Sequence, residues 1–160
     1  MRGMIRSGCL LACCLSATLL ASQAHAAPWW EACRQTVLDY AYYRDRPDAD
    51  GVAALFTDDA TFTLGADKFV GREAIRARIQ AGVQGPVFRH MMSTIKIMPV
   101  NEREARGVSY AAVYSGAAGP LPVVAADFLA LGEYHDEFVR QGKACKIRSR
   151  EFVRVIVPAD

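Results

Sequence analysis

The first third of the chain contains apolar positions that repeat with the period of a helix. Steps of three and four residues separate Trp30, Cys33, Val37, Tyr40 and Ala41. This spacing places them on one helical face, so we predict a helix from about Trp29 to Arg44. The helix ends before Pro47, because proline disfavours helical geometry in the residue that precedes it.

Two further short helices and a strand are predicted in the next forty residues. Asp48 is a suitable N-cap for a second helix that continues through Leu55. A turn at Thr57–Asp59 then leads into a strand from Ala60 to Leu64, where apolar and polar positions alternate. The segment from Gly71 to Gly82 has the apolar spacing of a third helix, and its final glycine is a natural end.

The second half of the chain changes to long segments rich in β-forming residues. Four strands are predicted, from Val87 to Met98, Glu104 to Ser115, Val123 to Phe138 and Ala144 to Val157. Helices followed by consecutive long strands indicate an α+β domain with a largely antiparallel sheet. Strands of this length curl, and helices packed on the concave face would form a cone-shaped roll with a pocket inside.

The first 26 residues have the features of an export signal. A positively charged start precedes an apolar run from Cys9 to Leu20, and Ala24-His25-Ala26 offers small residues where a signal peptidase cleaves. We predict cleavage after Ala26, which leaves a single domain over residues 27–160 in the periplasm or outside the cell. A lipoprotein signal ending at Cys13 is the alternative, which the short apolar run before it disfavours.

Removal of the predicted signal leaves a nearly neutral chain. It takes away Arg2 and Arg6, so that 19 basic residues become 17, equal to the 17 acidic residues. The remaining 134 residues (160 minus 26) are enough for one domain with a hydrophobic core. A chain without excess positive charge offers no bulk attraction for nucleic acid or an anionic membrane. We therefore expect neither nucleic-acid binding nor stable membrane insertion.

Cys33 and Cys145 are the two cysteines outside the predicted signal. In an oxidising compartment they would form a disulfide between the first helix and the last strand. In the chain-entropy model, closing so long a loop stabilises a protein by about 4–5 kcal/mol. Two separate buried thiols are the alternative.

Asp45 is a charged residue where the first helix predicts an apolar one. It lies four residues after Ala41 and eight after Val37, so its side chain continues the buried stripe. A buried carboxylate needs a partner or a raised pKa. The alternative is a carboxylate that caps the end of the helix or extends into water.

His90 is the candidate partner for this carboxylate. It shares a strand face with Phe88 and Met92, which predicts an apolar environment. A histidine there is commonly a core residue, but an aspartate bonded to an imidazole fixes its tautomer and leaves the other nitrogen free as a general base. His135 falls on the charged face of its strand and is predicted to lie at the surface. Two histidines on separate elements lack the spacing of a metal site, so we predict no metal or other cofactor.

Other polar residues on the predicted inner faces are candidates for binding a ligand. Asp136 lies on the apolar face of its strand and needs a cation, for which Arg148 and Arg150 are available. We favour a structural ion pair and keep substrate binding by Arg150 as the alternative. The remaining candidates for substrate binding share a phenol hydroxyl group and are Tyr40, Tyr114 and Tyr134. Tyrosine in a core is the commoner case.

Short motifs spread over most of the chain follow the order found in a known family. They are Tyr40-x4-Asp45-x2-Asp48-x-Asp50, residues 53–60 (AALFTDDA), 71–75 (GREAI), 89–91 (RHM), 132–140 (GEYHDEFVR) and Ile147-x2-Arg150. Together they resemble the SnoaL-like proteins of the nuclear-transport-factor-2-like (NTF2-like) superfamily. The resemblance covers nearly all of residues 27–160 and implies a curved, mostly antiparallel sheet wrapped around N-terminal helices, with a deep apolar pocket.

One branch of that superfamily, which includes scytalone dehydratase, hexachlorocyclohexane dehydrochlorinase and bile-acid dehydratase, uses an Asp–His pair as its base. Asp45 and His90 fall at the matching positions. The resemblance implies that His90 takes a proton beside an electron-withdrawing group, Asp45 orients it, Tyr40 binds or polarises the substrate, and water or another group leaves without a cofactor. This chain differs from those enzymes at two positions. Ser115 lies near the position of the second histidine of scytalone dehydratase, and Leu64 lies near the position where a tyrosine is expected.

The sequence therefore predicts a cofactor-independent lyase (dehydratase-like) or isomerase for a small, largely apolar organic substrate. A non-catalytic periplasmic module for ligand binding or assembly is the alternative, favoured by the export signal and the incomplete site. A purely structural role ranks third. The resemblance also implies a homodimer formed through the open face of the sheet.

Overall fold

The computed structural model describes residues 27–159, apart from the side chains of residues 125–127. The predicted export signal and the lipoprotein alternative at Cys13 therefore lie outside the described residues. In the part of the chain that is described, no helix is both long enough and apolar enough to cross a membrane.

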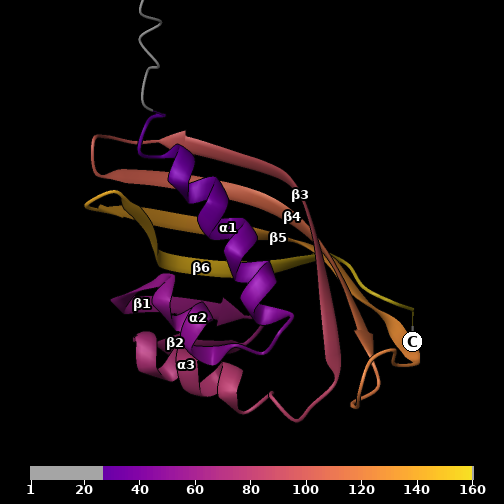
Figure 1. Ribbon diagram of the computed structural model, residues 1–160. Coiled ribbons are helices and arrows are strands. Elements are labelled where there is room, and N and C mark those ends of the chain that lie inside the picture. The colour runs from indigo at the N-terminus through magenta and orange to yellow at the C-terminus, as the bar shows by residue number, and fades with distance from the viewer. Residues whose placement is uncertain (1–26, 160) are drawn as a thin grey trace, which may run out of the picture.

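Three helices cover one face of a curved, six-stranded sheet (Figure 1). The helices are α1 (Glu31–Arg44), α2 (Ala49–Ala54) and α3 (Arg72–Gln80). The strands are β1 (Phe56–Leu64), β2 (Asp67–Val70), β3 (Val87–Pro99), β4 (Glu104–Gly116), β5 (Ala125–Gln141) and β6 (Ala144–Ile156). Their order in the sheet is β2-β1-β6-β5-β4-β3. Only β1 and β6 pair in parallel, which confirms the predicted α+β class with a largely antiparallel sheet.

The long strands bend around α1, which crosses the concave face of the sheet (Figure 1). The apolar stripe of α1 is buried, as its period predicts, and Val37 and Tyr40 are among its least exposed residues. The inward positions of β4 are small residues, such as Ala105, Gly107 and Ala111. Small side chains leave space inside the curved sheet for larger ones from other elements, because packing in a core depends on matched volumes.

The region between the second and third helices differs from the prediction in two ways. β1 begins at Phe56, before the predicted turn at Thr57–Asp59, and its pairing with β6 shifts register between Phe56 and Thr61. This irregularity accounts for the polar residues that resemble a turn in the sequence. β2 was not predicted, and it is only four residues long.

Asp48 caps α2 as predicted, since its carboxylate accepts a hydrogen bond from the amide of Gly51 at 2.8 Å.

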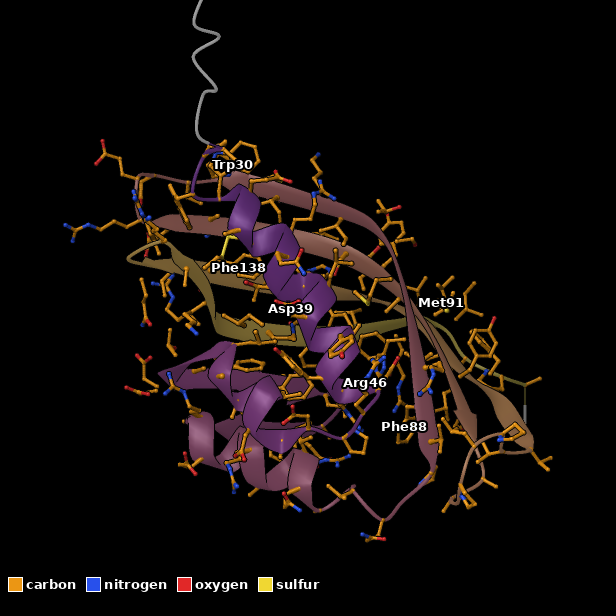
Figure 2. All side chains as sticks on the ribbon, viewed as in Figure 1. Trp30, Asp39, Arg46, Phe88, Met91 and Phe138 are labelled. Atoms are coloured by element: carbon orange, nitrogen blue, oxygen red, sulfur yellow. A yellow bond between two sulfur atoms is a disulfide. The ribbon has the colours of Figure 1, made fainter. Side chains whose placement is uncertain are left out.

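A disulfide joins α1 to β6. Cys33 and Cys145 are bonded, both are buried, and 112 residues separate them in sequence. Figure 2 shows the bond between two sulfur atoms beside α1. The hydroxyl of Thr36 also donates to the backbone carbonyl of Cys145 at 2.9 Å. The start of α1 is therefore fixed to the sheet by a covalent bond and a buried hydrogen bond.

Candidate active site

Asp45 and His90 meet at the point where α1 ends. Nδ1 of His90 lies 2.6 Å from Oδ1 of Asp45, and the backbone amide of His90 donates to Oδ2 at 2.9 Å. The two side chains are only 11% and 7% exposed for Asp45 and His90 respectively. Both oxygens of a nearly buried carboxylate are thus bonded to one residue, which satisfies the requirement for a partner. Asp45 points inward, as its place on the helical stripe predicts.

The backbone around this pair fixes its geometry. Asp45 is the C-cap of α1, and its amide donates to the carbonyl of Ala41 at 3.0 Å. The guanidinium of Arg89 donates to the carbonyl of Asp45 at 3.1 Å and to that of Phe88 at 2.7 Å. A cation on the last carbonyls of a helix stabilises its end. The end of α1 is therefore joined to β3 both through the Asp45 carboxylate, which bonds His90, and through the Asp45 carbonyl, which accepts from Arg89.

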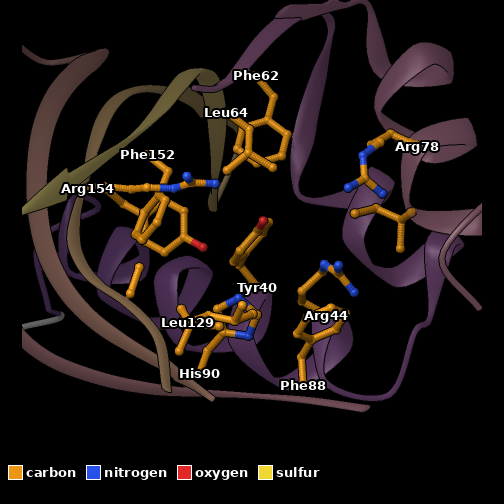
Figure 3. Close-up of a pocket in the computed structure, with 14 residues that line it drawn as sticks. Tyr40, Arg44, Phe62, Leu64, Arg78, Phe88, His90, Leu129, Phe152 and Arg154 are labelled. Carbon is orange, nitrogen blue, oxygen red and sulfur yellow. The ribbon is translucent and has the colours of Figure 1, made fainter. Parts of the chain in front are cut away.

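His90 faces a cavity of about 280 Å³. With Nδ1 bonded to Asp45, Nε2 is the nitrogen that remains, and it has no protein hydrogen bond within the described residues. The ring of Tyr40 packs edge-on against the imidazole, with 6.3 Å between centroids. Apolar side chains form most of the walls, among them Phe62, Leu64 and Phe152 (Figure 3). A neutral imidazole held in this way has an unshared pair directed at a mostly apolar space.

Two of the tyrosines predicted to bind substrate line this cavity. Tyr40 and Tyr134 pack edge to face, with ring centroids 5.4 Å apart. Burial raises the pKa of Tyr134 well above its ordinary value, and Tyr40 adds to this shift while Arg150 opposes it. The Tyr134 hydroxyl therefore stays protonated over the whole range in which proteins are stable, and it is suited to donate a hydrogen bond.

Tyr114 does not reach the cavity, which corrects the prediction for this residue. It lies on the outer face of β4, is 48% exposed and packs against Phe128. The inward positions of β4 alternate with Tyr114 and hold small residues such as Ala111 and Val113. In this strand the large aromatic side chain of Tyr114 therefore lies on the convex face.

Arg150 forms the structural ion pair that the sequence favoured over substrate binding. Nε and Nη2 of Arg150 each lie 2.7 Å from one oxygen of Asp136, and both side chains are almost completely buried. The guanidinium also stacks on Tyr40 and Tyr134, at 4.1 and 4.5 Å from the ring centroids. Burial disfavours its charge, but Asp136 outweighs this effect and raises the pKa of Arg150. Arg150 does not line the cavity; it supports two tyrosines that do.

The other predicted polar residues lie away from the cavity. Arg148 pairs with Glu104 at 2.7 Å and with Glu137 at 3.3 Å, so it is not the partner of Asp136. His135 lies at the surface, as predicted, with Nε2 2.8 Å from Glu133. Within residues 27–159, no group of three or more His, Cys, Asp or Glu side chains is placed to hold a metal ion.

Three cavity residues were not predicted from the sequence. Arg44, Arg78 and Arg154 line the cavity from α1, α3 and β6 (Figure 3). A signal for two of them was available, because Arg44 lies one helical turn after Tyr40 and Arg154 shares a strand face with Phe152. Nothing comparable marks Arg78, because its helix has an exposed face rich in arginine.

Comparison with known proteins identifies the family. Residues 30–151 match the SnoaL-like domain. The chain belongs to the SnoaL-like family. A comparison with curated proteins found no match. Its SnoaL-like fold has the architecture of the NTF2-like superfamily, as the resemblance implied.

Solved structures share this SnoaL-like fold at low sequence identity. A proposed scytalone dehydratase from Novosphingobium aromaticivorans is 24% identical, with a TM-score of 0.69, and the match covers 80% of this chain and 85% of that one. A variant of Rv3472, a protein of unknown function from Mycobacterium tuberculosis, is 23% identical, with a TM-score of 0.69 and coverage of 78% and 70%. A hexachlorocyclohexane dehydrochlorinase, LinA-type3 from Novosphingobium barchaimii, is 15% identical, with a TM-score of 0.66 and coverage of 80% and 87%. At these identities the likeness establishes the fold.

Proposed function

We propose that this SnoaL-like protein is a cofactor-independent lyase of the dehydratase type, or an isomerase, with Asp45 and His90 as its base. The observation that carries the proposal is the 2.6 Å contact between Oδ1 of Asp45 and Nδ1 of His90 at the wall of a mostly apolar cavity. The contact holds the imidazole as the tautomer protonated on Nδ1, which leaves Nε2 to accept a proton. A positioned base of this kind contributes on the order of 10²–10⁴-fold in rate.

The residues around the cavity support the following sequence of steps. Nε2 of His90 removes a proton from a carbon next to an electron-withdrawing group, and the imidazolium that forms is stabilised by Asp45. The hydroxyl of Tyr40 or Tyr134 donates a hydrogen bond to the oxygen that gains negative charge. The electron pair then expels a leaving group from the neighbouring carbon, or it is protonated elsewhere to give an isomer. When hydroxide leaves, the proton on His90 completes a molecule of water.

Turnover of a panel of activated substrates tests this proposal. The panel contains β-hydroxy ketones, β-hydroxy acids and enones, and the loss of water or the shift of the double bond is followed by absorbance. We expect at least one member to be converted, with the rate reduced on the order of 10²–10⁴-fold in His90→Ala. His135→Ala is the matched control, because His135 is exposed and neither it nor its partner Glu133 lines the cavity. Equal rates for wild type and His90→Ala would exclude His90 as the base.

A second candidate function is non-catalytic binding of a small ligand or assembly with a partner. It is favoured by Leu64, which lines the cavity where the related dehydratases are expected to have a tyrosine. An apolar side chain there adds contact area and removes a hydrogen-bond donor. Native mass spectrometry separates the two functions. A ligand that remains bound to both the wild type and His90→Ala, with no turnover by either protein, supports binding alone.

We further propose that residues 27–160 form a single exported domain. The support is the Cys33–Cys145 bond, since disulfides form and persist in oxidising compartments. Mass spectrometry of the protein recovered from the periplasm would show a chain that begins at Ala27 and is two hydrogens lighter than its reduced form. A chain that retains residues 1–26 would contradict this.

A further inference from the structure

The cavity has a strong bias in charge that the proposed chemistry does not use. Three of its lining residues are arginines, namely Arg44, Arg78 and Arg154, and none is an aspartate or glutamate. Figure 3 shows the guanidinium groups of Arg44 and Arg78 directed toward each other at one end, while Arg154 reaches in from the opposite side. The carboxylate of Asp45, behind His90, does not line the cavity and is already bonded twice to His90.

Six of the other arginines among the described residues have a carboxylate partner. Arg72, Arg76 and Arg150 each lie within 2.7 Å of a carboxylate oxygen. By contrast, no carboxylate among the described side chains lies within ion-pair distance of the three cavity arginines. Arg44 stacks its guanidinium on Phe88, 4.9 Å from the ring centroid, and so stays at the cavity wall.

Apart from His90 and the hydroxyl groups of Tyr40 and Tyr134, the rest of the cavity is apolar. Aromatic and aliphatic side chains from several elements surround the space between the arginines, including Phe62, Leu64, Phe88 and Phe152. A cluster of guanidinium groups matches the planar geometry of a carboxylate, and each can donate two parallel hydrogen bonds. Apolar walls that surround such donors fit a molecule with a hydrocarbon body and one acidic group.

We propose that the cavity selects organic acids, with the carboxylate bound between Arg44 and Arg78 and the hydrocarbon body packed between the apolar walls, while Arg154 adds positive charge from the opposite side. This inference rests on the proposed function only in taking the cavity as the substrate site. It narrows the substrate from a largely apolar molecule to an apolar carboxylic acid. A carboxylate held at the arginines also fixes which carbon of the body lies beside Nε2 of His90.

Direct binding of matched acids and amides tests the inference. The probes are benzoate, cyclohexanecarboxylate and 2-naphthoate, each with its neutral carboxamide, measured by calorimetry and by ligand-observed NMR. We expect at least one acid to bind at least about tenfold more tightly than its amide, since a charge-assisted hydrogen bond contributes that much or more. The preference is expected to shrink as NaCl is raised, because the cavity is open to screening ions.

Single substitutions identify the residues responsible. Arg44→Gln and Arg78→Gln are each expected to weaken acid binding about tenfold and to leave amide binding nearly unchanged. Arg154→Gln is expected to weaken acid binding less, because Arg154 lies on the opposite side of the cavity. Arg106→Gln is the control, because Arg106 is 68% exposed and lies 3.9 Å from Glu137, outside the cavity. A cooperative thermal melt of each variant checks that it is folded.

The outcomes separate this inference from the proposed function. His90→Ala is expected to keep the preference for acids. A wild-type protein that binds acids but converts no substrate would support the acid-binding inference and contradict the proposed lyase or isomerase activity. Equal binding of acids and amides, no binding of any acid in the panel, or acid affinity unchanged in both Arg44→Gln and Arg78→Gln would overturn the inference, whether or not turnover is found.

Discussion

Asp136→Asn removes the charge that balances the buried guanidinium of Arg150. The wild-type pair has two contacts of 2.7 Å, and neither side chain is more than 1% exposed. Nη1 of Arg150 is also buried without a hydrogen-bond partner among the described residues, so no spare carboxylate compensates on that side. Removing one partner of a buried ion pair typically costs about 3–5 kcal/mol, because the other charge is left unpaired. With an unfolding entropy of about 2.1 cal/mol/K per residue, this lowers the Tm of a domain of this length by about 10–20 °C.

Thermal and urea unfolding of the oxidised protein, followed by circular dichroism, measure this loss. Asp58→Asn is the matched control, because Asp58 pairs with Arg72 at the same 2.7 Å but its side chain is 89% exposed. Exposed ion pairs contribute little, so the Tm of the control is expected to remain almost unchanged. A loss of less than about 1 kcal/mol in Asp136→Asn would refute the reasoning, since it would mean that the stacked tyrosines alone stabilise the buried cation.

Three further substitutions test the fold. Replacing both Cys33 and Cys145 by serine is expected to lower the free energy of unfolding by about 4–5 kcal/mol, measured by urea titration with and without reductant; a reductant-insensitive wild type would contradict it. Asp48→Ala removes the N-cap of α2 and is expected to cost about 1 kcal/mol in the same titration, with no change counting against the cap. Gly132→Ala places a methyl group 2.5 Å from the backbone oxygen of Val153, so we expect a loss on the order of 1–3 kcal/mol, and an unchanged midpoint would contradict that contact.

Periodicity was sufficient to predict the main elements because each buries one side. The stripe of α1 and the alternation of β5 place Tyr40, Tyr134 and Asp136 on inner faces, and the structure confirms each of them. Tyr114 was a candidate because of its hydroxyl group alone, and the alternation of β4, which buries Ala111 and Val113, places it on the outer face.

The candidate site could be predicted only where a residue contradicted its local pattern. Asp45 is a charged residue on an apolar stripe, and His90 is a polar residue among apolar neighbours. Each needs a buried hydrogen-bond partner, and each can be that partner for the other. Arg44 and Arg154 share a face with Tyr40 and Phe152, which is a weak signal because arginine is common at helix ends and on exposed strand positions, and Arg78 has no such signal. Their convergence depends on how α3 and β6 are placed around the cavity, which requires the three-dimensional fold.

The central claim is that Asp45 acts through His90. The most direct test is the steady-state kinetics of Asp45→Asn with a substrate found in the panel. Asp45 lies behind the imidazole and does not line the cavity, so its loss should leave substrate binding intact and disturb the tautomer of His90. The account predicts that kcat falls on the order of 10²–10⁴-fold while KM changes little. A kcat equal to that of the wild type would contradict it.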